Sequence, residues 1–194
     1  MKKLLITGFE PFGGEEINPS WEVVRRLPDE IGGFSLTKLL VPVVFGKAAK
    51  YVMNAADKLM PDVIISVGQA GGRRAITPEM LAINLRFAKI PDNEGNLPKD
   101  ESIVAGGESA YFSTLPVRKI AEAINERGVL SEVSYSAGAY VCNDLLYTLL
   151  DRYSAEGVGV GFIHVPYVSE QGKEPSMSLD DIVKGLTAAI ESIE

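Results

Sequence analysis

The sequence predicts an α/β protein, built as a three-layer α/β/α sandwich around a mixed, largely parallel sheet. Apolar runs of strand length alternate with segments of helical periodicity along the chain. Glycine-rich turns directly follow two of the apolar runs, at 8–14 and 69–72. With 194 residues, 46% of them hydrophobic, the chain can bury one sizeable core, and nothing calls for a second domain over 1–194.

The first strand is expected at 2–7, a short apolar run that breaks into the turn-rich segment 8–14. A helix is expected at 21–27, directly after Ser20. The segment 34–41 then predicts the second strand.

Apolar residues recur at helical spacing through 48–59 and stop at Pro61, which predicts the second helix. The continuous apolar run 62–68 predicts a buried strand that leads into the turn 69–72. The segment 80–87 is apolar enough to predict another strand.

In the second half of the chain, Pro116 is placed as the first residue of a helix that Gly128 ends. A further strand is expected at 132–136. The last helix is expected to begin at Ser178, because Asp181 three positions later completes a capping-box pattern.

The chain contains one cysteine, Cys142, and one histidine, His164. Cys142 opens the helix-like stretch 143–150, where first-turn N–H groups and the helix dipole stabilise a thiolate. His164 follows the apolar run 158–163, at the carboxyl end of a predicted buried strand, where open α/β sheets build their sites. The two residues are therefore candidates for the nucleophile and the base of thiol chemistry.

Each of these residues also has a structural interpretation, as a small buried cysteine or a hydrogen-bonded histidine. The carboxylate of Asp144 would raise the pKa of the thiol if it faced the sulfur, although an acidic residue also suits a helix start. Spacing does not select the third member of a triad, because several acidic residues lie near the loops at the sheet ends. These are Glu10, Glu79, Asp144 and Glu170.

Other site chemistries lack residues that they need. A zinc site requires three or four ligands, so one cysteine and one histidine would leave the rest to carboxylates. The Gly-Lys pair at 46–47 is not a phosphate loop, because position 41 is Val and position 48 is Ala. The glycine clusters 8–14 and 68–72 do not match the dinucleotide fingerprint. Each cluster could let the backbone approach a ligand closely, or it could simply form a tight turn. We expect neither a metal nor a cofactor.

The balance of 19 basic and 26 acidic residues gives a net charge of −7, without a dense Lys/Arg tract. Nucleic acid and anionic membrane surfaces are therefore not expected partners. A single cysteine forms no intrachain disulfide, so nothing points to an oxidising compartment. The apolar run 4–6 is too short for a secretion signal, and no stretch of roughly 18 apolar residues could span a membrane. We expect a cytoplasmic protein.

Blocks of sequence along nearly the whole chain resemble the pyroglutamyl peptidase I family, also called pyrrolidone-carboxylate peptidases, which are cysteine peptidases. Each block is several residues long and combines turn formers with chemically specific side chains. The blocks are 8–14 (GFEPFGG), 18–20 (NPS), 68–73 (GQAGGR), 76–79 (ITPE), 82–84 (AIN), 90–93 (IPDN), 136–138 (SAG), 140–143 (YVCN) and 161–166 (GFIHVP).

The resemblance implies an omega-peptidase that removes an N-terminal pyroglutamyl residue through a thioester, with the chain 1–194 as a single peptidase domain. It implies Cys142 as nucleophile, His164 as general base and acid, and Glu79 as the residue that orients the imidazole. It also implies a substrate pocket that holds the flat lactam ring and reads its polar edge. The residues assigned to this pocket are Phe9, Phe12, Gln69, Ile90 and Val141.

The chain departs from the commonest family pattern at Ala139, Asp144 and Ser169, which affects the surroundings of the nucleophile and leaves the triad intact. The resemblance further implies a homotetramer. The aperiodic segment 88–108 could be a solvated excursion, a lid or a subunit contact. Two other functions stay open: a different thiol amidohydrolase or esterase, and a non-catalytic ligand-binding protein on the same scaffold.

Overall fold

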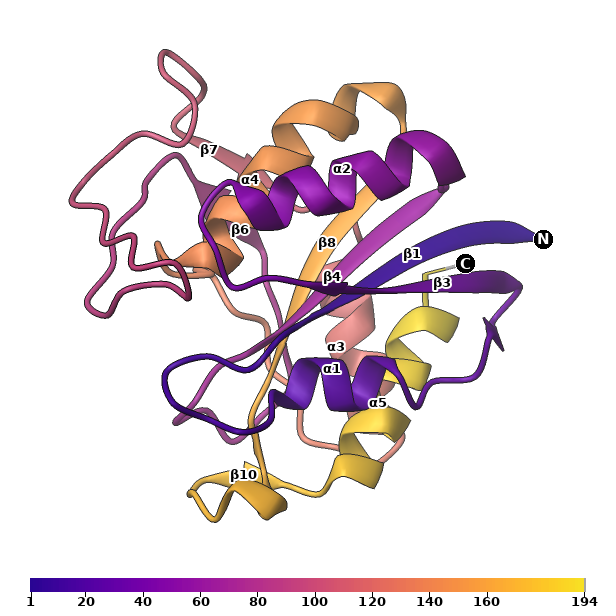
Figure 1. Ribbon diagram of the computed structural model, residues 1–194. Helices are drawn as coiled ribbons and strands as arrows, with labels where there is room; N and C mark the ends of the chain where they lie inside the picture. The colour runs from indigo at the N-terminus through magenta and orange to yellow at the C-terminus, as the bar shows by residue number, and fades with distance from the viewer. Residues whose placement is uncertain (194) are drawn as a thin grey trace.

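The computed structural model describes residues 1–193 and is built on a six-stranded sheet in the order β2-β3-β1-β4-β8-β5 (Figure 1). Neighbouring strands from β3 to β8 run parallel, and β2 and β5 are antiparallel strands at the two edges. The bounds are β1 Lys2–Phe9, β2 Glu30–Ile31, β3 Phe34–Val41, β4 Val63–Gln69, β5 Thr77–Pro78 and β8 Gly159–Val165.

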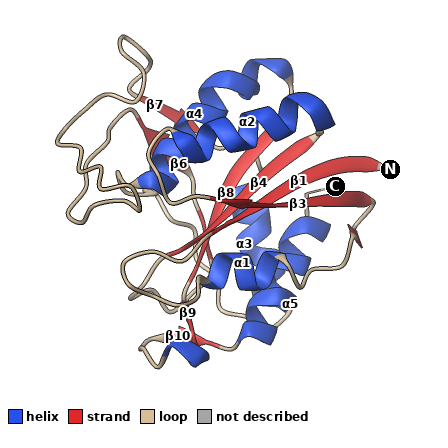
Figure 2. Ribbon diagram, in the orientation of Figure 1, coloured by secondary structure: helices blue, strands red, loops and turns tan. Residues whose placement is uncertain are grey.

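Helices cover both faces of this sheet (Figure 2). Helices α2 and α4 pack together on one face, and α1, α3 and α5 lie on the other. The bounds are α1 Pro19–Val24, α2 Lys47–Leu59, α3 Val117–Glu126, α4 Val141–Tyr153 and α5 Leu179–Glu191. The expected three-layer α/β/α sandwich around a largely parallel sheet is confirmed.

Short elements complete the fold at the sheet edges. Two small ladders join β6 Leu81–Ile83 to β7 Ala110–Phe112, and β9 Tyr167–Val168 to β10 Ser176–Met177. Two 3₁₀ turns are η1 Ser154–Glu156 and η2 Ser169–Gln171. Within residues 1–193, no helix is long and apolar enough to cross a bilayer.

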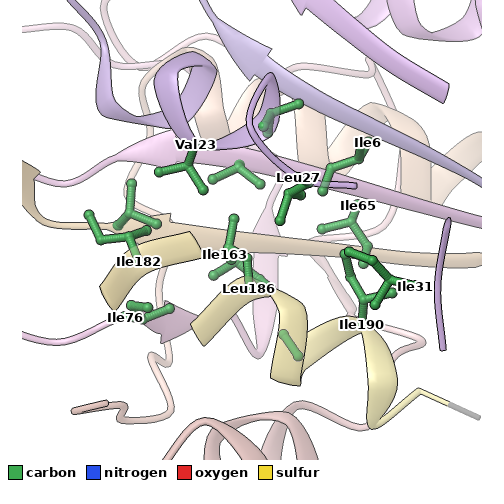
Figure 3. Packing of buried hydrophobic residues seen from close by; sticks show 14 of the residues in the cluster. Ile6, Val23, Leu27, Ile31, Ile65, Ile76, Ile163, Ile182, Leu186 and Ile190 are labelled. Carbon is green, nitrogen blue, oxygen red and sulfur yellow. The ribbon is translucent and has the colours of Figure 1, made fainter. Parts of the chain in front are cut away.

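Each face of the sheet has its own apolar core. Figure 3 shows the core beneath α1 and α5, where Val23, Ile65 and Leu186 are buried. The second core lies under α2 and α4 and includes Val52 and Leu146. Because β1, β4 and β8 are buried between these two layers, their sequences are continuous apolar runs rather than alternating ones.

Several predicted elements differ from the structure at their boundaries. The helix expected at 21–27 begins earlier, because Asn18 supplies the N-cap and Pro19 the first helical position, and it ends at Val24. Pro116 is the N-cap of α3 rather than its first residue. Ser178 is the N-cap of α5 as expected, and its hydroxyl accepts a hydrogen bond from the N–H of Asp181 at 3.1 Å.

Two predicted strands are wrong. The segment 80–87 holds only the short strand β6, which pairs with β7 outside the main sheet. The segment 132–136 forms no strand, and single bridges join Ser131 to Ile76 and Ser134 to Glu79. The strand at 80–87 was predicted from apolar content alone, which does not distinguish a long strand from a chain that turns repeatedly at a sheet edge.

Gly8 lets α1 sit directly against the end of β1. A Cβ atom at Gly8 would lie 2.7 Å from the Trp21 Cα and 2.8 Å from the Ser20 carbonyl oxygen. The contact is further fixed by the Phe9 N–H, which donates to the Ser20 hydroxyl at 2.9 Å. The glycine therefore fixes the position of the loop that follows β1.

We expect Gly8→Ala to lower the free energy of unfolding by about 1–3 kcal/mol, because backbone atoms cannot yield to the added methyl group. Chemical denaturation monitored by circular dichroism measures the loss. Ser35→Ala, on the exposed side of β3, is the matched control and should change little. Equal stability of Gly8→Ala and the parent would contradict the close packing.

Candidate active site

The sheet register brings Cys142 and His164 to the same end of the central strands. His164 in β8 pairs with Gly68 in β4, near the carboxyl ends of both strands. Cys142 is the second residue of α4, and its sulfur lies 3.0 Å from where a Cβ of Gly68 would stand. The thiol therefore packs against the backbone of β4 at Gly68, and β4 is the neighbour of β8, which carries His164.

A short hydrogen bond joins His164 to Glu79. The His164 Nδ1 lies 2.6 Å from the Glu79 Oε1, and both side chains are buried. A carboxylate accepts at this contact, so the proton belongs on Nδ1 and leaves Nε2 as the nitrogen that can take a proton from another group. This is the arrangement of a base and its orienting acid in a nucleophile–base–acid triad.

Arg73 contacts the same carboxylate oxygen as the histidine. Its Nη1 donates to the Glu79 Oε1 at 2.7 Å and to the Thr77 hydroxyl at 2.6 Å. Burial by itself raises the pKa of Glu79, but the hydrogen bond and charge of His164, aided by Ser134 and Arg73, outweigh burial and lower that pKa below its usual value. Glu79 is therefore ionised at neutral pH and can stabilise a charged imidazole.

The Cys142 thiol is neutral at rest. Cys142 as a whole is partly exposed, but its sulfur is buried. This burial, together with the negative charge of Glu79, raises the pKa of the thiol to about 12, and the positive charge of Arg73 lowers it to a smaller extent. Very little thiolate is present at neutral pH under these conditions. A nucleophilic attack by Cys142 therefore requires a base that removes the proton as the new bond forms.

Asp144 does not contribute to this shift, because its side chain binds elsewhere. It accepts from the Gly46 N–H at 2.7 Å and pairs with the Arg86 Nε at 2.6 Å, fully buried. The neighbouring Asn143 bonds both backbone groups of Ile83. These two residues fix the first turn of α4, and with it Cys142, to the loops around it.

Of the four acidic residues that the sequence left open, the structure brings one, Glu79, to the histidine. The Glu10 Oε1 instead accepts from the Val43 N–H at 3.2 Å and from the Asn93 side chain at 2.8 Å. Glu170 is exposed on η2.

A mostly apolar pocket opens beside the thiol. Four of its lining residues were assigned to it from the sequence: Phe9, Phe12, Gln69 and Val141. Ile90, also assigned from the sequence, is not among the lining residues and is 47% exposed. The structure adds three lining residues that the sequence analysis did not assign: Asn18, Val43 and Tyr140.

Aromatic contacts define the walls of this pocket. Phe9 lies 6.3 Å from the Phe162 ring, and Phe162 lies 4.7 Å from the His164 ring. Phe12 and Tyr140 approach each other at 6.3 Å on the loops. The motif blocks 18–20 and 140–143, which contain Asn18 and Tyr140, could have indicated the place of these two residues, whereas Val43 lies outside every block and carries no sequence signal.

We expect alkylation of Cys142 by iodoacetamide to be slow at pH 7 and to increase about tenfold per pH unit up to pH 9, because the raised pKa keeps the thiol protonated throughout this range. Mass spectrometry of the single thiol follows the reaction. The same chain in urea is the control and should level off above an ordinary thiol pKa of about 8.5. A plateau below pH 8 in the folded protein would show instead that the thiolate already exists at rest.

Comparison with known proteins places these features in one family. The family model described as pyroglutamyl peptidase matches residues 2–194. The pyrrolidone-carboxylate peptidase of Lactobacillus acidophilus is 51% identical over 98% of each chain, and that of Thermococcus onnurineus is 48% identical over 98% of each. The crystal structure of Bacillus amyloliquefaciens pyroglutamyl peptidase I superposes with a TM-score of 0.95 at 50% identity, covering 100% of this chain and 97% of that one. The chain therefore belongs to the pyroglutamyl peptidase family.

Proposed function

We propose that this chain hydrolyses the bond after an N-terminal pyroglutamyl residue of peptides, with Cys142 as nucleophile, His164 as general base and acid, and Glu79 as the orienting carboxylate. The observation that carries the assignment is the buried Glu79–His164 hydrogen bond beside a thiol that borders an apolar pocket. Family membership supports the reaction, because the relatives are cysteine-type peptidases named for this activity.

The reaction begins with proton transfer from the Cys142 thiol to the Nε2 of His164. The sulfur attacks the carbonyl carbon that joins pyroglutamate to the next residue, and the negative charge moves to the carbonyl oxygen. Backbone N–H groups in the first turn of α4 are the nearest preorganised donors for this oxyanion. Glu79 stabilises the imidazolium that forms in this step.

Breakdown of the tetrahedral intermediate releases the peptide amine, which takes its proton from His164. The acyl group remains on Cys142 as a thioester. Water, deprotonated by His164, then attacks the thioester and releases pyroglutamate and the free thiol. Every step uses groups of the chain and water.

The pocket supplies the specificity. Phe9 and Phe12 bring flat apolar surfaces to the lactam ring, and Val141 precedes the nucleophile at the pocket wall. Gln69 brings a side-chain amide to the polar edge of the ring. Pyroglutamate differs from proline by its ring carbonyl and lactam N–H, so a site with partners for both groups rejects proline strongly.

Three further properties are proposed. Length and composition support a single peptidase domain over 1–194 and a cytoplasmic protein, and the family resemblance alone supports a homotetramer. The segment 88–108 and the stretch after Val168 are candidates for subunit contacts.

A different thiol amidohydrolase or esterase on this scaffold is the alternative reaction, and a non-catalytic ligand-binding protein is the alternative class. Offering a chromogenic pyroglutamyl amide and a simple ester, before and after alkylation of the thiol, separates the three. The proposed function predicts amide hydrolysis that alkylation abolishes.

We expect Cys142→Ser, Cys142→Ala and His164→Ala each to lower kcat/KM for a pyroglutamyl amide by several orders of magnitude while the fold is retained. Glu79→Gln should lower kcat/KM less, because an orienting group contributes less than the group that carries the proton. Circular dichroism confirms folding, and Glu170→Gln is the acidic control. Activity of folded Cys142→Ser within about tenfold of the parent would exclude this nucleophile. A greater loss in Glu10→Gln than in Glu79→Gln would exclude Glu79 as the third member.

We expect a pyroglutamyl amide to be preferred over a prolyl amide by roughly 10⁴ or more in kcat/KM, because the prolyl ring leaves the buried polar groups of the site unpaired. Open-chain glutaminyl amides should be rejected as well. Gln69→Ala should weaken this discrimination more than Phe12→Leu, which removes only apolar contact. A ratio near unity in the parent would favour a general thiol aminopeptidase.

A further inference from the structure

A relay of side-chain hydrogen bonds connects the turn η2 with the pocket residue Gln69. The Gln171 Nε2 donates to the Gln69 Oε1 at 3.0 Å and to the Glu15 Oε2 at 3.2 Å. The Gln171 Oε1 in turn accepts from the Val168 N–H at 3.1 Å. Gln171 is half-buried, and it comes from the segment that follows the histidine strand.

The two ends of this relay fix its direction. A backbone N–H such as that of Val168 only donates, so it must meet the oxygen of Gln171. An ionised carboxylate such as that of Glu15 only accepts, so it must meet the NH₂ group of Gln171. Gln69 therefore has to present its oxygen to Gln171, which leaves its NH₂ group as the end available to a ligand.

The charge of Glu15 keeps this end of the relay acceptor-only at neutral pH. Lys173 forms an ion pair with Glu15. The hydrogen bond within this pair lowers the pKa of the Glu15 carboxyl below its usual value, and the hydrogen bond from Gln171 makes a smaller contribution. The Glu15 N–H also donates to the Phe12 carbonyl at 3.2 Å, so the relay holds the pocket loop that carries Phe12 as well.

We propose that Gln171 is a positioning residue that sets substrate specificity by fixing the orientation of the Gln69 amide. The Gln69 NH₂ group then donates to the ring carbonyl of pyroglutamate. A freely rotating glutamine would present its oxygen part of the time, and that oxygen repels the ring carbonyl. The inference rests on the proposed function, since it concerns how the same pocket reads the lactam.

The test is a double-mutant cycle of Gln69→Ala and Gln171→Met, with kcat/KM measured for pyroglutamyl and prolyl amides. Gln171→Met keeps the length of the side chain and removes its polarity. We expect it to lower the preference for the pyroglutamyl amide by about tenfold to a hundredfold, mostly through KM, because ring recognition is common to the ground and transition states. In the Gln69→Ala background the same change should have little further effect on the preference.

Gln171→Glu is a second variant of nearly identical shape that still accepts from the Val168 N–H. Its carboxylate can donate neither to Gln69 nor to Glu15, and it also faces the negative charge of Glu15. Gln69 therefore turns its NH₂ group toward position 171 and its oxygen toward the pocket. We expect this variant to lose at least as much preference as Gln171→Met. Glu170→Gln, on the same turn but exposed, is the control and should match the parent.

The outcomes separate the inference from the function on which it rests. A parent enzyme without preference for the pyroglutamyl amide overturns the proposed function. A parent with strong preference, combined with full preference in folded Gln171→Glu, overturns the positioning role. Additive losses in the double-mutant cycle also overturn it, because a residue that only supports the fold would act independently of Gln69.

Discussion

A carboxylate without access to solvent must find its compensation inside the protein, and at the centre of this molecule that carboxylate is Glu79. It is compensated from two directions, by the hydrogen bond to His164 of β8 and by the positive charge of Arg73 in the loop after β4. Three separate segments of the chain therefore have to meet within hydrogen-bond distance. Two strand pairings make this possible. The parallel pairing of β4 with β8 places the loop after β4 beside the carboxyl end of β8, and the antiparallel pairing of β5 with β8 places Glu79 next to His164.

Cys142 is held by a second, independent set of contacts. Asn143 and Asp144 follow Cys142 directly and bind the backbone around Ile83 and Gly46. The Arg86–Asp144 ion pair adds a contact to the chain just before the segment 88–108. His164 is thus positioned by the sheet and Cys142 by the start of α4, so a substitution in one set need not displace the other.

The sequence was sufficient for the layer order, and it singled out Cys142 and His164 as candidate functional residues. Continuous apolar runs identify β1, β4 and β8, because only strands buried on both faces lack alternation. It failed at 80–87 and 132–136, where long-range pairing and turns, rather than local composition, decide the path of the chain. Ile90 is not among the residues that line the pocket of the free protein, so its part in substrate binding stays a prediction.

The structure also supplied what spacing could not. No sequence distance distinguishes Glu79 from Glu10, which lies on a neighbouring loop and binds the Val43 N–H instead. The carboxylate of Asp144, two residues after Cys142, suggested a raised pKa of the thiol, but partners far away in sequence, Gly46 and Arg86, bind this carboxylate instead. Hydrogen-bond partners of this kind depend on side-chain direction, which is a property of the folded chain.

The presence of a single cysteine in 194 residues gives this protein an internal counting standard. Each mole of thiol reagent consumed by the unfolded chain reports one mole of polypeptide with an intact thiol, and each mole consumed by the folded chain reports one mole of Cys142 that the reagent reaches in its native setting. The ratio of the two is the fraction of intact thiols that are accessible in the folded protein, and comparison with total protein gives the fraction of chains whose thiol is intact. Preparations can therefore be normalised by thiol titration, without reference to turnover, and an inactive preparation with full titration would have lost something other than its thiol.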